Sequence, residues 1–79
     1  MESIIRIDGR VFEWIDEMNA YQCRGEVMYD DEHDQIPEPA LWDAAEKLVV
    51  RLKEEGHFAQ AEHSEKGWVE VQILKKEEA

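Results

Sequence analysis

The sequence predicts an α+β fold in which a small antiparallel sheet packs against one main helix. This fold is predicted from two hairpin patterns, at residues 3–15 and 59–73, and from an amphipathic segment between them at residues 39–55. The 79 residues allow a single domain, 1–79, in which we expect residues 75–79 to form a frayed tail.

The N-terminal hairpin is predicted from Asp8-Gly9, which lies between runs of β-branched and aromatic residues. Both central residues of a type I′ turn need positive φ, which Asp-Gly supplies. The resulting register sets Ile5 opposite Phe12 and places both on the core face with Trp14. An alternative interpretation keeps only the first strand and forms a second helix over residues 10–24.

In the hairpin interpretation, a turn at residues 16–19 leads to a third strand near residues 20–29. Residues 30–35 are too charged to bury and form a loop. The two prolines of residues 36–39 then impose an extended entry to the helix. We expect the helix to span residues 39–55 and to stop at Gly56, and its apolar stripe is Leu41, Ala44, Ala45, Leu48, Val49 and Leu52.

The C-terminal hairpin is predicted with a three-residue loop at residues 65–67, where Gly67 takes the left-handed position. This register pairs Ala61 with Val71 and places Ala59, Ala61, Val69, Val71 and Ile73 on the face beneath the helix. It also sets Glu62 directly opposite Glu70. Two like charges at this spacing destabilise a sheet unless solvent or a basic partner relieves them.

Charge is the most unusual property of the chain, whose formal net charge is −11. Eleven acids against the single base Arg24 give residues 13–46 a net charge of −10. Such a field repels nucleic acid and anionic membranes and attracts basic surfaces. No leader peptide is visible and no apolar run approaches the ~18 residues of a membrane span, so we expect a cytoplasmic protein.

Catalytic and metal-binding patterns are missing from the sequence. The acidic segment that begins at Asp30 does not fit a calcium-binding EF-hand loop, because Gln35 and Leu41 occupy its sixth and twelfth positions. His57 and His63 lie too far apart along one strand to share an ion, and Cys23 has no second thiol to complete a zinc site. We therefore expect no enzyme, no metal and no cofactor.

The leading hypothesis is an acidic inhibitor that occupies a basic surface, for example on a nucleic-acid-binding protein, by imitating a phosphate backbone. Its size and charge resemble those of the phage-encoded inhibitors of restriction and CRISPR systems. The hypothesis requires the carboxylates to gather on one surface. The predicted partner-binding residues are Asp30, Asp31, Glu32, Asp34, Glu38, Trp42, Asp43 and Glu46.

Two other functions fit the same sequence. The first is an assembly module, including a homo-oligomer, that binds through an exposed strand edge and is acidic only for solubility. The second is a weak divalent-metal loop in the acidic segment 30–34.

Overall fold

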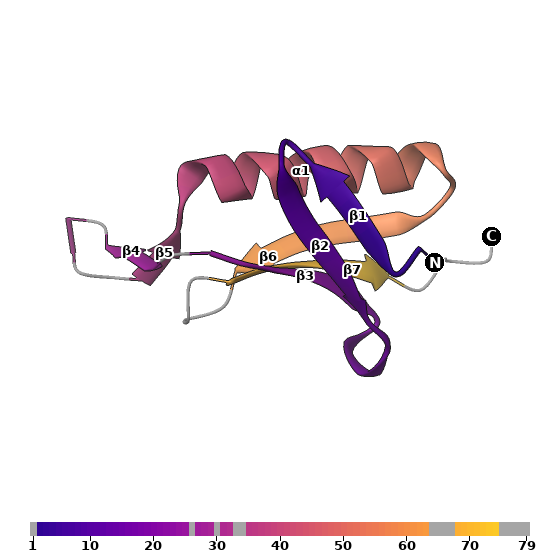
Figure 1. Ribbon diagram of the computed structural model, residues 1–79, viewed down its shortest axis with the longest axis horizontal. Helices are drawn as coiled ribbons and strands as arrows, with labels where there is room; N and C mark the ends of the chain where they lie inside the picture. The colour runs from indigo at the N-terminus through magenta and orange to yellow at the C-terminus, as the bar shows by residue number, and fades with distance from the viewer. Residues whose placement is uncertain (1, 26, 30, 33–34, 64–67, 75–79) are drawn as a thin grey trace.

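The computed structural model shows one five-stranded antiparallel sheet with one main helix on a single face, which confirms the predicted α+β fold (Figure 1). The structure describes residues 2–25, 27–29, 31–32, 35–63 and 68–74. In chain order the elements are β1 (Ile4–Ile7), β2 (Arg10–Ile15), the 3₁₀ turn η1 (Asp16–Met18), β3 (Ala20–Arg24), β4 (Val27–Tyr29), β5 (Gln35–Pro37), α1 (Pro39–Glu54), β6 (Phe58–His63) and β7 (Trp68–Leu74). The sheet order is β1-β2-β3-β7-β6, and β4 pairs with β5 in a separate hairpin.

The N-terminal hairpin has the predicted register, with Ile5 opposite Phe12. Asp8 and Gly9 both have positive φ, 51° and 77°, as a type I′ turn requires. The alternative helix over residues 10–24 is wrong. That segment forms β2, η1 and β3, because Trp14 pairs across the strands with Tyr21, and their rings lie 5.0 Å apart in an edge-to-face contact.

The third strand begins where predicted but ends earlier. The pairing of β3 with β7 ends at Arg24, whose partner Trp68 is the first residue of β7, and residues 27–29 pair with β5 instead. The predicted single strand over residues 20–29 is therefore divided between β3 and β4. Strand β5 confirms the extended entry to the helix, and the predicted loop positions 30, 33 and 34 lie outside the described residues.

Helix α1 buries most of the predicted stripe, namely Leu41, Ala44, Ala45, Leu48 and Leu52, while Val49 is partly buried. It ends in a Schellman motif: the N–H of His57 donates to Leu52, the N–H of Gly56 donates to Lys53, and Gly56 has φ 92°. The predicted glycine stop is confirmed.

The C-terminal hairpin also has the predicted register, including Ala61 opposite Val71 and Glu62 opposite Glu70. Its predicted loop at residues 65–67 lies outside the described residues. Val69 and Val71 are fully buried beneath α1, together with Phe12 from β2 and Tyr21 from β3. The core thus lies between α1 and one face of the sheet, and the opposite sheet face carries no helix (Figure 1). Within the described residues, no helix has the length and apolarity needed to cross a bilayer.

Candidate functional site

The predicted partner-binding residues that the structure describes belong to the β4–β5 turn, to the residue before α1 and to the first half of α1. Asp31 and Glu32 are exposed at the turn between β4 and β5, which projects beyond the first turn of α1 (Figure 1). Trp42, Asp43 and Glu46 lie on the first half of α1, and we call these three residues the acidic-aromatic patch. Asp30 and Asp34 lie outside the described residues.

Other acids of the central segment lie elsewhere. Glu13 is exposed on β2, and Asp16 and Glu17 are exposed in η1, at the connection between β2 and β3. The fold therefore does not gather all the carboxylates of residues 13–46 on one surface. Any binding through this charge depends on a local group of acids.

The acidic-aromatic patch has a defined geometry. The indole Nε1 of Trp42 donates a hydrogen bond of 2.9 Å to Oε1 of Glu46, one helical turn later. The Trp42 ring meets the His63 ring at the end of β6 in an edge-to-face contact, with centroids 6.2 Å apart. Because Trp42 is also packed against the core, it holds the Glu46 carboxylate in place while that residue stays exposed.

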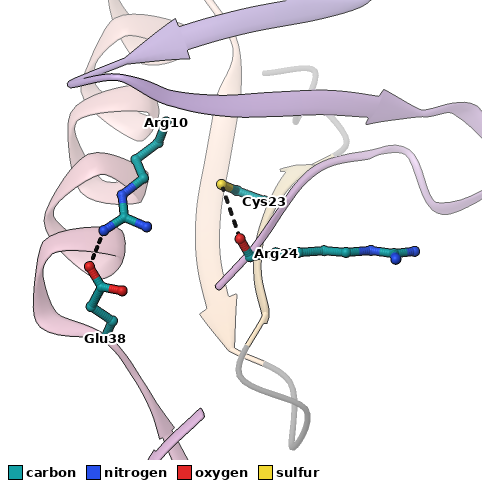
Figure 2. Close-up of polar contacts among 4 residues, drawn as sticks. All are labelled: Arg10, Cys23, Arg24 and Glu38. Atoms are coloured by element: carbon teal, nitrogen blue, oxygen red, sulfur yellow. Dashed lines mark hydrogen bonds and ion pairs between the residues drawn. The ribbon is translucent and has the colours of Figure 1, made fainter. Parts of the chain in front are cut away.

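Glu38 has a different environment from the patch. Its carboxylate accepts a hydrogen bond from the Arg10 guanidinium, and both side chains are only 29% exposed (Figure 2). This ion pair joins β2 to the residue that precedes α1. Glu38 thus contributes to the tertiary structure, and less of its charge is available to a partner.

Three ion pairs join the N-terminal segment to the region of α1. Besides Arg10 and Glu38, Lys47 Nζ lies 2.5 Å from Asp8 and Arg51 lies 3.6 Å from Glu2. The hydrogen bond to Asp8 raises the pKa of Lys47 above its ordinary value. Three of the six lysine and arginine residues that the structure describes are held in this way.

Arg24 is held by a different contact. Its guanidinium lies over the ring of the half-buried Trp68, 4.4 Å from the centroid, and Figure 2 shows it pointing away from the pair of Arg10 and Glu38. None of the ion pairs among the described residues includes Asp43 or Glu46. Lys47, which pairs with Asp8, also interacts with the charge of Asp43 one helical turn earlier. Asp43 and Glu46 both remain exposed, so a cation from another molecule can reach them.

Cys23 is buried in the sheet, on strand β3. Cys23 is 5% exposed, its Sγ lies 3.9 Å from the Arg24 carbonyl oxygen (Figure 2), and burial raises its thiol pKa. A raised pKa leaves less of the nucleophilic thiolate at neutral pH. Among the residues that the structure describes, no group of three or more His, Cys, Asp or Glu side chains is placed to hold a metal ion.

The repulsion between Glu62 and Glu70 is partly relieved by neighbouring side chains, which the sequence did not predict. Gln60 and Gln72, which face each other across β6 and β7, donate side-chain hydrogen bonds of 2.6 and 3.1 Å to the two carboxylate oxygens of Glu62. These amide donors offset part of the repulsion without a basic partner.

A shallow groove that the sequence did not predict lies between α1 and β6. Its walls are Trp42, Glu46, Val49, Val50 and Lys53 from α1 and Ala59, Gln60 and Ala61 from β6. We call it the α1–β6 groove. Two signals in the sequence mark it: small residues at 59 and 61 on the inner face of the strand, and Val50 outside the buried stripe, where it is 55% exposed.

No protein-family model, curated protein or solved structure matches this chain.

Proposed function

We propose that this protein is a small, non-catalytic, cytoplasmic binding module that recognises a basic surface on a partner protein through the acidic-aromatic patch. The narrower form of the proposal, an inhibitor that occupies the nucleic-acid-binding groove of its partner, would depend on these local acids alone, because the acids of β2 and η1 lie elsewhere. The observation that carries the proposal is the exposed pair Asp43 and Glu46 beside Trp42, neither of which forms an ion pair with a described residue.

The distribution of cations supports the proposal. Half of the described bases form ion pairs with acids within the protein, and the described acids Asp31, Asp43 and Glu46 are exposed. An aromatic side chain beside such charges adds apolar contact, and tryptophan is enriched among the residues that dominate binding energy. The same field opposes direct binding of nucleic acid or an anionic membrane.

Two charge-reversal variants test the proposal, because both change the net charge equally. Asp43→Lys combined with Glu46→Lys alters the acidic-aromatic patch, whereas Asp16→Lys combined with Glu17→Lys alters η1. We expect the patch variant to lose the partner captured from a host lysate and the η1 variant to keep most of it. Affinity of the captured partner for the wild-type protein should fall steeply with salt, and the protein should displace nucleic acid from that partner.

The competing function is an assembly module that binds through a strand edge and is acidic for solubility. It is supported by the two edges of the five-stranded sheet, β1 and β6, beyond which no strand lies among the described residues. Under this function, capture resists high salt and survives both charge reversals, and this outcome would replace the first proposal.

A further inference from the structure

The α1–β6 groove lies beside an unpaired edge of the sheet. Strand β6 is the last strand in the order β1-β2-β3-β7-β6, and no described strand lies on its other side. An edge strand presents unpaired backbone N–H and C=O groups along its length. A groove next to such an edge can receive the side chains of any strand that pairs with it.

The first four residues of β6 lack the usual protection of an edge strand, and the charged residue of this strand, Glu62, comes near its end. Residues 58–61 contain no proline and no charged side chain, although these are the usual devices that prevent pairing at an edge. Ala59 and Ala61 present only methyl groups toward α1, so the space beside the helix stays open. The opposite edge, β1, has four residues and includes Arg6.

The two ends of the groove differ in charge. Glu46 lies at one end, near the contact between Trp42 and His63, and Lys53 lies at the other end, near the start of β6. Seven helical residues separate them, which is about 10 Å, or roughly three residues of an extended strand. The exposed Val50 lies between them. The groove therefore fits a cation at the Glu46 end and an apolar side chain next to it.

A second copy of this chain is a poor occupant. Each copy carries a net charge of −11, so two copies repel each other as they approach. The acids Glu46 and Glu62 would meet like charge in a complex that pairs two β6 edges. Complementary charge instead favours a basic segment from another protein.

We propose that an extended, lysine- or arginine-bearing segment of a partner pairs with β6 as a sixth strand. It places an apolar side chain against Val50 and Ala59 and its cation against Glu46. This inference rests on the proposed function for the basic character of the partner, and it adds the mode of binding: main-chain hydrogen bonds supply affinity, and the groove selects the side chains.

The probe is a synthetic octapeptide of alternating lysine and valine. It is compared with two N-methylated versions, one methylated at the odd backbone positions and the other at the even positions. N-methylation keeps the charge but removes the donors needed for a strand ladder. We expect each methylation that removes a ladder bond to weaken binding by about tenfold. Amide resonances of residues 58–63 should shift on binding and their hydrogen exchange should slow.

A matched pair of variants locates the site. Val50→Lys places a cation in the groove, whereas Val11→Lys makes the same change on the opposite sheet face, and these valines are 55% and 45% exposed. We expect about tenfold weaker peptide binding for Val50→Lys and less than about a twofold change for Val11→Lys. The melting temperature of both variants is measured first, because the comparison requires them to remain folded.

Several outcomes would overturn the inference. If methylated and unmethylated peptides bind equally and salt weakens both, the proposed recognition of a basic partner is kept, but the proposed pairing of its segment with β6 is rejected. If the peptide does not bind, or if the shifts lie on the opposite sheet face, the groove has no such occupant. A dimer of the free protein that Val50→Lys dissociates would assign the edge to a second copy.

Discussion

The hydroxyl of Tyr21 donates a 2.7 Å hydrogen bond to the backbone carbonyl oxygen of Glu2, which ties the start of the chain to the central strand β3. Tyr21 is fully buried and its ring packs on Trp14. This residue therefore combines core packing with a polar contact near the protein surface.

We expect Tyr21→Phe to lower the free energy of unfolding by about 1 kcal/mol, because it removes one hydrogen bond and keeps the ring. Tyr21→Ala should cost about 3–5 kcal/mol, because it also leaves a cavity. Urea unfolding followed by tryptophan fluorescence measures both values. Equal losses in the two variants would mean that the hydroxyl, and not the ring, dominates.

The ion pair of Arg10 and Glu38 should stabilise the contact between β2 and the start of α1. Both side chains are partly buried, so we expect a coupling of about 1 kcal/mol in a double-mutant cycle of Arg10→Met and Glu38→Gln. Lys53→Met is the control, since Lys53 forms no ion pair with a described residue. A coupling near zero would show that solvent screens the pair.

Asn19 holds the turn between β2 and β3 in a left-handed conformation, with φ 52°. Its Nδ2 donates a 2.9 Å hydrogen bond to the Ile73 carbonyl oxygen, and its own carbonyl oxygen accepts from the Ile73 N–H at 3.0 Å. Asn19→Gly loses only the side-chain bond and should cost about 1 kcal/mol, whereas Asn19→Ala also strains the backbone and should cost about 2 kcal/mol. Thermal unfolding would contradict this interpretation if alanine were tolerated better than glycine.

Stability should fall at alkaline pH. Burial raises the pKa of the Cys23 thiol above 9.0 and that of the Tyr21 hydroxyl above 10.0. The folded state therefore holds these protons more tightly than the unfolded state does, and this contribution is complete below pH 9 and is lost as pH rises through the folded pKa values.

Cys23→Val isolates the thiol. We expect the decline in unfolding free energy between pH 9 and 10 to become shallower in this variant, while the decline above pH 10 persists through Tyr21. The native thiol should also react slowly with a soluble disulfide reagent, because Cys23 is buried. Rapid labelling at neutral pH without unfolding would show that the thiol is accessible.

Local sequence patterns were sufficient to predict both hairpins of the main sheet and the helix. Asp8-Gly9 determined the first turn, and the alternation of residues 59–73 determined the register that sets Glu62 opposite Glu70. The division of residues 20–29 was not predictable in the same way. It depends on where β7 begins, and that strand lies more than 40 residues later in the chain.

Composition and the periodicities of neighbouring residues were enough to predict the charge of the protein, its fold class and most of its core. Which carboxylates form ion pairs and which do not depends on the three-dimensional fold. The fold brought Arg10 to Glu38 and Lys47 to Asp8, separated η1 from the acidic-aromatic patch, and placed β6 at an edge beside α1. These relationships join residues far apart in the chain, where neither spacing nor composition indicates which groups will meet.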